Sequence, residues 1–247
     1  MNKKRVIWVT NPKGGVGKSM TASILVDYYL QSHRPLIVEA DGSVPDVGRR
    51  YDKVVPGVLA SICGDDPVNA LYGLLEKIEG KATDEKFDRI VVNLPANSSV
   101  IEDVADEILA VTNALGIENN TVFVIAEGDD SATLCAQSCE LGICSISRRK
   151  VAVVNGHFGR TPDRFAWFSS VAREAWLASG NAELFLPNLH RRVRELPEIQ
   201  LGRLSAYTSP GLHGVSLVNQ MVLRKFVKAG FAIGDALEDV DSEELVK

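Results

Sequence analysis

The sequence has few cysteines, few aromatic side chains and no long hydrophobic run. Of its 247 residues, 6% are aromatic and only four are cysteines, and no two cysteines form a C-x-x-C pair. A chain of this length with so few cysteines does not depend on a disulfide framework. No apolar run reaches the ~18–20 residues that a membrane-spanning helix needs, and the first residues lead into a strand-like run instead of a secretory leader. We therefore expect a cytoplasmic protein with reduced cysteines.

The four cysteines are Cys63, Cys135, Cys139 and Cys144. Cys135 and Cys139 lie four residues apart, about one turn of a helix, and could both face one ligand. No third ligand lies near them in the sequence, and free cysteine is among the residue types most often buried. We expect buried thiols rather than a metal centre built from cysteines.

Composition and organisation indicate one globular domain. Hydrophobic residues make up 45% of the chain and charged residues 24%, which are ordinary values for a folded protein. The length is within the range of a single α/β domain. We find no internal repeat, low-complexity segment or linker-like change in composition. One domain is expected over residues 1–234, followed by an acidic tail over residues 235–247.

The net charge of −5 conceals a strong segregation of charge along the chain. Residues 145–228 carry 13 basic and 5 acidic side chains, a net charge of +8, whereas residues 229–247 carry 1 basic and 6 acidic side chains. A basic block of this kind either binds a polyanion or only keeps the surface solvated.

Short apolar runs alternate with longer amphipathic stretches along the chain, which is typical of a parallel sheet flanked by helices. Strands are expected at residues 5–10, 35–40, 89–94, 121–126, 150–155 and 183–186. Helices are expected at residues 18–32, 67–79, 100–114, 131–145, 162–179, 191–201 and 215–229. Most of these strands are rich in Val and Ile with little polar alternation, as buried parallel strands are. The predicted fold class is α/β, with a doubly wound, mostly parallel sheet and helices on both faces.

A glycine-rich segment, N-P-K-G-G-V-G-K-S-M at residues 11–20, links the first expected strand to the first expected helix. Its glycines permit positive φ angles, so that backbone N–H groups can turn toward phosphate oxygens at the positive end of the helix. Lys18 would neutralise the β and γ phosphates, and Ser19 would ligate Mg²⁺. Pro12 stands where G-x-x-x-x-G-K-[ST] has its first glycine, and the segment fits K-G-G-x-G-K-[ST], with Lys13 as a second cation. The other interpretation is a plain glycine-rich turn.

This loop resembles that of the deviant Walker A ATPases, the P-loop family that includes the ParA and MinD proteins, at every defined position. The resemblance implies ATP and Mg²⁺ as cofactors and a homodimer with ATP between the subunits. Lys13 would then reach the phosphates of the partner subunit. The nucleotide-binding residues implied in the loop are Lys13, Gly14, Gly15, Val16, Gly17, Lys18, Ser19 and Met20.

Two further segments resemble the switch regions of this family. The second expected strand leads into Glu39-Ala40-Asp41, and the resemblance gives Asp41 a place beside Lys13 and Lys18 in catalysis, positioning the attacking water near the metal. An aspartate before glycine could instead only cap a loop. Asn93 stands where the family usually has the switch II aspartate. Its amide can hydrogen-bond a Mg²⁺-bound water but supplies no charge, so slow hydrolysis is expected; residues 93–97 could alternatively form only a turn.

Two later segments resemble the part of the family that holds the base. Residues 151–155 end in Asn155, whose amide offers a donor and an acceptor to the N6/N7 edge of adenine. Pro187 lies in a short segment that resembles the loop closing over the base. The resemblance covers residues 5 to about 230 and is most specific in the first motif.

The resemblance implies a molecular switch that acts in plasmid partition, plasmid stability or conjugative DNA transfer, most similar to the plasmid-borne branch of StbB- and TraL-like proteins. Non-specific DNA binding is expected at Arg191, Arg192 and Arg194. Such DNA binding would place the protein on the nucleoid. The expected protein partner is a partition or relaxosome adaptor. The acidic tail lacks the cations that binding to an anionic membrane requires.

Two other classes remain open. One is a P-loop metabolic enzyme similar to dethiobiotin synthetase, which transfers phosphate to a small substrate, although no acid–base or nucleophile constellation is evident. The other is an iron–sulfur reductase similar to the nitrogenase iron protein. Its cysteines would follow the third expected strand closely, where residues 97–99 are Asn-Ser-Ser.

Overall fold

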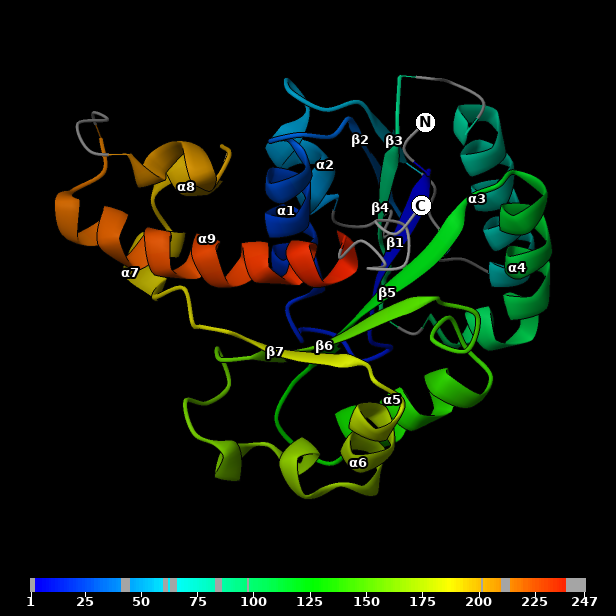
Figure 1. Ribbon diagram of the computed structural model, residues 1–247. Helices are drawn as coiled ribbons and strands as arrows, with labels where there is room; N and C mark the ends of the chain where they lie inside the picture. Colours follow the sequence, from blue (N-terminus) through cyan, green and yellow to red (C-terminus); the bar gives the residue numbers. More distant parts are fainter. Residues whose placement is uncertain are drawn as a thin grey trace, which may run out of the picture.

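A computed structural model describes residues 3–40, 45–59, 62, 66–82, 86–96, 98–200, 202–209 and 214–238. Its centre is a seven-stranded sheet with the order β3-β2-β4-β1-β5-β6-β7, in which every neighbouring pair is parallel (Figure 1). The strands are β1 (Arg5–Thr10), β2 (Pro35–Glu39), β3 (Gly57–Leu59), β4 (Arg89–Asn93), β5 (Glu118–Ile125), β6 (Arg149–Asn155) and β7 (Ala182–Leu186). The expected α/β class with a doubly wound parallel sheet is confirmed.

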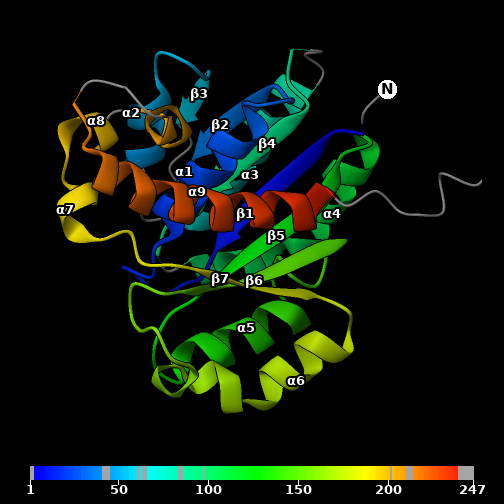
Figure 2. The same cartoon turned by 60° about the vertical axis from the view of Figure 1, so that its left-hand side comes forward.

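Helices cover both faces of this sheet (Figures 1 and 2). The α-helices are α1 (Lys18–Tyr29), α2 (Asp46–Tyr51), α3 (Pro67–Ala82), α4 (Ala105–Ala114), α5 (Asp130–Glu140), α6 (Val171–Ala178), α7 (Arg191–Arg194), α8 (Pro197–Gln200) and α9 (Leu217–Glu238). Four 3₁₀ segments are η1 (Ser98–Val104), η2 (Pro162–Arg164), η3 (Ala166–Ser169) and η4 (Ser205–Thr208).

Alternate side chains of the strands supply two hydrophobic layers, because successive residues of a strand point to opposite faces. In β1, Ile7 and Val9 pack with α1 and α9 on one face, while Val6 and Trp8 pack with α3 and α4 on the other. A third cluster continues that second face beneath α5 and α6, around Trp167. Both faces of the central strands are therefore buried, which explains their continuous Val and Ile content.

Six strands lie where the sequence predicts them, to within three residues at each end. The expected helices are less accurate. The segment 162–179 is η2 and η3 followed by α6, whose first turn is capped by Ser170 accepting the N–H of Arg173. The segment 191–201 is divided into α7 and α8, with Pro197 at the start of α8. Strand β3 and helix α2 were not predicted.

Helix α9 extends nine residues beyond its expected end at Ala229, so residues 235–238 of the expected tail belong to the helix and not to a frayed segment. Its last residue, Glu238, holds Arg89 by two contacts of 2.7 and 2.6 Å and also pairs with Arg5. Burial by itself would lower the pKa of Arg89, but the hydrogen bond and charge of Glu238 outweigh it and raise that pKa. Residues 239–247 lie outside the described part of the chain.

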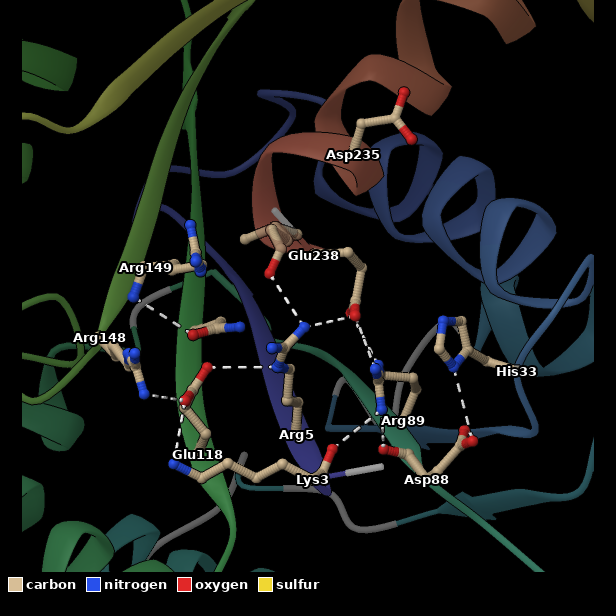
Figure 3. Close-up of polar contacts among 12 residues, drawn as sticks. Lys3, Arg5, His33, Asp88, Arg89, Glu118, Arg148, Arg149, Asp235 and Glu238 are labelled. Atoms are coloured by element: carbon tan, nitrogen blue, oxygen red, sulfur yellow. Dashed lines mark hydrogen bonds and ion pairs between the residues drawn. The ribbon is translucent and has the colours of Figure 1, made fainter. Parts of the chain in front are cut away.

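The contacts of Glu238 belong to a larger group at the amino ends of the strands, which we call the basal ion-pair cluster (Figure 3). Glu118, at the start of β5, lies 3.2 Å from Lys3, 3.2 Å from Arg5 and 3.1 Å from Arg148. The basal ion-pair cluster therefore joins the end of α9 to β1, β4 and β5.

Cys135 and Cys144 are buried and Cys139 is half-buried, and these three described cysteines form no disulfide. No group of three His, Cys, Asp or Glu side chains suited to a metal ion occurs in the described residues. The expectation of buried thiols is thus confirmed for Cys135 and Cys144, while Cys63 lies outside the described residues. No helix in the described ranges is both long and apolar enough to cross a membrane.

Candidate functional site

The glycine-rich loop lies at the carboxyl end of β1, the central strand, directly before α1. From β1 the chain continues to strands on one side of the sheet, β2 among them, whereas β5 lies on the other side of β1. Doubly wound sheets bind ligands in the crevice at such a reversal of strand order. Asn11 fixes the loop to β5, because its side-chain amide donates to the carbonyl of Val124 at 2.8 Å. The same side chain accepts the N–H of Lys13 at 2.8 Å.

The loop has the backbone geometry of an anion cradle. Gly15 and Gly17 have φ angles of 73° and 102°, in the left-handed region that favours glycine. A Cβ at Gly17 would also collide with the side-chain nitrogen of Asn155, so a larger residue there would displace Asn155 from its contact with the carbonyl of Val16. Lys18 is buried, and its ammonium donates to the carbonyl oxygens of Asn11 and Lys13 at 2.8 and 2.9 Å. A cavity of about 280 Å³ borders the loop from Gly14 to Met20.

Lys13 does not turn into this cradle. Its ammonium lies 2.9 Å from a carboxylate oxygen of Asp130, at the first residue of α5, and both side chains are largely exposed. The second cation of the loop therefore points toward α5 and the surface. An exposed pair of this kind contributes only about 0–1 kcal/mol, so little opposes its exchange for another partner.

Three oxygen-bearing side chains meet beside the cradle. Asn93, the last residue of β4, donates its amide to Glu39 at the end of β2 and lies 3.4 Å from the hydroxyl of Ser19. The side-chain oxygen of Asn93 is buried and has no hydrogen-bond partner among the described residues. Ser19 offers a hydroxyl and Glu39 a carboxylate, both of them ligand types that Mg²⁺ prefers. The amide nitrogen of Asn93 faces these two side chains, and its free oxygen could accept a hydrogen bond from a metal-bound water, so the residue types fit the metal.

Glu39 was not assigned a role by sequence reasoning, although it precedes Asp41 in the same acidic pair. Its second oxygen accepts the N–H groups of Val47 and Gly48, each at 3.0 Å, from the first turn of α2. Burial raises the pKa of Glu39, and hydrogen bonds from Asn93, Gly48 and Val47 oppose that rise. The short α2 thus holds a buried carboxylate against Asn93. Asp41 itself lies outside the described residues.

The residues expected to hold the base also lie against the loop. Asn155, at the end of β6, donates to the carbonyl of Val16 at 2.7 Å and accepts the N–H of His157 at 3.0 Å. Asn155 and Pro187 line one cavity of about 120 Å³ together with Gly15 and Gly17. The structure therefore brings the two residues together as the sequence suggests, while their contact with adenine stays a prediction.

The three arginines expected to bind DNA have different surroundings. Arg191 is exposed and pairs with Glu195 at 2.7 Å, and Arg192 is exposed. Arg194 is half-buried and lines the cavity that contains Asn155. They do not form one exposed basic surface, because α7 turns Arg194 inward toward the loop.

No protein-family model matches the chain. Protein MobD of Acidithiobacillus ferrooxidans is 29% identical over 196 residues, which cover 78% of this chain and 81% of that protein.

Two solved structures resemble the chain over nearly its whole length. The cell division ATPase MinD of Pyrococcus furiosus superposes with a TM-score of 0.56 at 16% identity, covering 98% of this chain and all of the other. The septum site-determining protein MinD of Pyrococcus horikoshii OT3, complexed with Mg-ADP, gives a TM-score of 0.54 at 14% identity and covers 96% of each chain. The chain therefore has the doubly wound α/β fold of the P-loop nucleoside triphosphatases.

Proposed function

We propose that the protein is a molecular switch that binds and slowly hydrolyses ATP and forms a homodimer around it. One observation carries this proposal. A loop with left-handed glycine backbone, the buried Lys18 and three oxygen-bearing side chains meet at one end of the sheet. Similarity to two MinD structures, one of them complexed with Mg-ADP, supports the same ligand class.

In this proposal the loop residues from Lys13 to Met20 bind the phosphates, and Asn155 and Pro187 hold the base. Ser19 and Asp41 are proposed as metal residues, and Asn93 would contact Mg²⁺ through a water. When bound, Mg²⁺ neutralises charge on the phosphate oxygens. Lys18 supplies a second positive charge, and Asp41 positions the attacking water.

Slow hydrolysis follows from the chemistry of β4. A neutral Asn93 replaces a charged group beside the metal ligands, and the one described carboxylate within its reach is the buried Glu39. Glu39 is already engaged by the amide of Asn93 and by two N–H groups of α2. The enzyme is therefore proposed to spend most of its cycle in the ATP-bound form, as a switch does.

We further propose that the switch acts in plasmid partition, plasmid stability or conjugative transfer. The similarity to a protein named MobD supports a branch concerned with DNA mobilisation. Non-specific DNA and a partition or relaxosome adaptor protein are the proposed partners, with location in the cytoplasm or on the nucleoid. The exposed cations near α7 and α9 support DNA binding. The proposed organisation is a single ATPase domain followed by an acidic tail, and the end of α9 extends the domain to Glu238.

The test is dimerisation measured by sedimentation velocity with ATP, ADP or no nucleotide. Wild-type protein should form a dimer only with ATP and Mg²⁺. Lys18→Ala should abolish ATP binding, whereas Lys13→Ala should bind ATP but remain monomeric, because Lys13 is proposed to act on the partner's phosphates.

A matched pair tests whether Asp130 restrains Lys13 in the monomer. Asp130→Asn should strengthen ATP-dependent dimerisation by up to about fivefold, the upper value of an exposed ion pair. Asp129→Asn, one residue away with no described ion pair, should not change it. A Lys13→Ala protein that dimerises like the wild type would disprove the role of Lys13 across the interface.

A further inference from the structure

A third cavity lies beside the phosphate loop, on the flank of α1 that faces α2, α7 and α8. Its volume is about 580 Å³, which is larger than either of the two cavities described above. Figures 1 and 2 place α2, α7 and α8 together on this side of the molecule. The lining residues are Ser19, Met20, Ser23, Asp46, Arg49, Arg50, Arg194 and Gln200, so three guanidinium groups face one carboxylate.

Two of the three arginines have partners. Arg49 lies 2.7 Å from Asp46, three residues earlier in α2. Arg50 donates to the carbonyls of Ile199 and Gly202, which attaches α2 to the end of α8. Burial lowers the pKa of Arg50, as expected for a guanidinium held by carbonyls and not by a carboxylate. Both of these guanidinium groups are therefore engaged by groups of the protein itself.

Arg194 differs from both. It is half-buried, and its guanidinium has no hydrogen bond or ion pair within the part of the chain that the structure describes. A cation withdrawn from water without a counter-charge is costly, and such groups are usually paired. The neighbouring Val193 is fully buried in the core beneath α1 and α9, which fixes the direction of Arg194.

The position of Arg194 points to its counter-charge. It lines the cavity beside Ser19 and also the cavity that contains Gly15, Gly17 and Asn155. Met20, the residue after the expected metal ligand, borders both of these cavities as well as the one within the loop. Arg194 therefore stands where the phosphate end and the base end of the site meet.

We propose that Arg194 binds a phosphate group of the nucleotide, as a second cation of the subunit beside Lys18. The planar fork of a guanidinium matches a pair of phosphate oxygens and forms strong, charge-assisted hydrogen bonds with them. Because α7 follows the segment that contains Pro187, this contact joins the segment proposed to hold the base to the phosphate cradle. The inference rests on the proposed function, since it concerns the same nucleotide.

The test compares ATP and ADP binding by isothermal titration calorimetry for the wild type, Arg194→Ala, Arg194→Lys and Arg192→Ala. Arg194→Ala should bind nucleotide about 10- to 100-fold more weakly than the wild type, because it loses a charged hydrogen bond. Arg194→Lys should fall between this variant and the wild type, because it keeps the charge and loses the fork. Arg192→Ala removes the same charge from the exposed side of α7 and should stay within about twofold of the wild type.

Thermal unfolding without nucleotide separates binding from folding. Arg194→Ala should be at least as stable as Arg192→Ala, because it removes an unpaired, half-buried charge. If wild-type protein binds ATP and Arg194→Ala binds it equally well, the inference is wrong while the proposed function stands. The same holds if Arg194→Ala loses DNA binding alone. If the wild type binds no ATP, the proposed function fails and the inference with it.

Discussion

The contact between Asn93 and Glu39 is the residue-scale feature on which the proposed metal site depends. Asn93 is the only described donor to one oxygen of Glu39, while the first turn of α2 satisfies the other oxygen. An aspartate at position 93 would replace this donor by a second carboxylate in a buried place. The amide is therefore compatible with Glu39 in the absence of metal, whereas two carboxylates would require a shared proton or a cation between them.

Asn93→Asp should accordingly destabilise the protein without metal by about 1–3 kcal/mol at neutral pH. A carboxyl group whose pKa is higher in the folded chain than in the unfolded chain binds more protons when folded. The free energy of unfolding therefore falls as pH rises through the interval between these two pKa values. Burial already raises the pKa of Glu39, and a neighbouring carboxylate would raise it further. The loss of stability in Asn93→Asp should thus appear above the ordinary carboxyl pKa and disappear in more acidic solution. Urea unfolding at several pH values measures it.

Mg²⁺ with ATP should stabilise Asn93→Asp more than it stabilises the wild type, because the cation neutralises the added charge. Asn93→Ala is the control, since it removes the donor without adding a carboxylate and should show a weaker dependence on pH. Equal pH dependence of the two variants would mean that Glu39 and position 93 do not interact electrostatically.

The residues of the site were predictable to the extent that they stand in a contiguous motif. The loop from Lys13 to Met20 could be predicted as an anion cradle because glycine, lysine and serine at fixed spacing have few other uses. The role of Glu39 could not, since it depends on the amide of Asn93 from another strand and on N–H groups of α2. Arg194 was assigned to DNA because charge along a sequence does not show which side of a short helix faces a cavity.

At the scale of elements, long apolar patterns were predictable and short elements were not. Strand β1 has the expected bounds because five of its six residues are buried. Strand β3 has three residues and helix α2 has six, including Gly48, so neither produces a periodic pattern. Helix α9 continues beyond its expected end because Glu238 binds Arg89 and Arg5, which lie far away in the sequence.

The packing of α9 on α1 gives a prediction at this scale. A Cβ on Gly230 would collide with the side chain of Ile24, which is fully buried. Overpacking of this kind costs about 1–3 kcal/mol, against a gain of about 1 kcal/mol in helix propensity for alanine. Gly230→Ala should therefore be less stable than Gly73→Ala, whose added methyl in α3 meets nothing within 4 Å.

Urea unfolding of the two alanine variants measures this difference directly. Gly73→Ala is expected to equal or exceed the wild type in stability, because it gains propensity without a clash. If Gly230→Ala were as stable as Gly73→Ala, the close approach of α1 and α9 would not limit the packing of the fold.

At the scale of the whole molecule, the basic block is divided between structural and exposed cations. Arg148 is held in the basal ion-pair cluster, Arg173 pairs with Glu183 and Arg203 pairs with the buried Asp27. The net charge of +8 over residues 145–228 therefore overstates the number of cations available to a polyanion. Among the exposed cations of α7 and α9, the side chains of Arg192, Lys225 and Lys228 have no ion pair or hydrogen bond within the described residues.

These three exposed cations predict the salt dependence of DNA binding by the ATP-bound dimer. With three phosphate contacts in each subunit, log K should fall against log salt concentration with a slope of about −5, taking roughly −0.9 for each contact. Replacing Lys225 and Lys228 by Ala leaves one contact in each subunit and should reduce the slope to about −2.

The control is Lys53→Ala with Lys81→Ala, which removes the same charge from exposed positions after α2 and in α3. It should leave the slope unchanged, because net charge alone does not form phosphate contacts. Fluorescence anisotropy with a DNA duplex across ~50–200 mM salt measures both slopes. Equal slopes for the two double variants, or equal binding with and without ATP, would contradict DNA binding through α9.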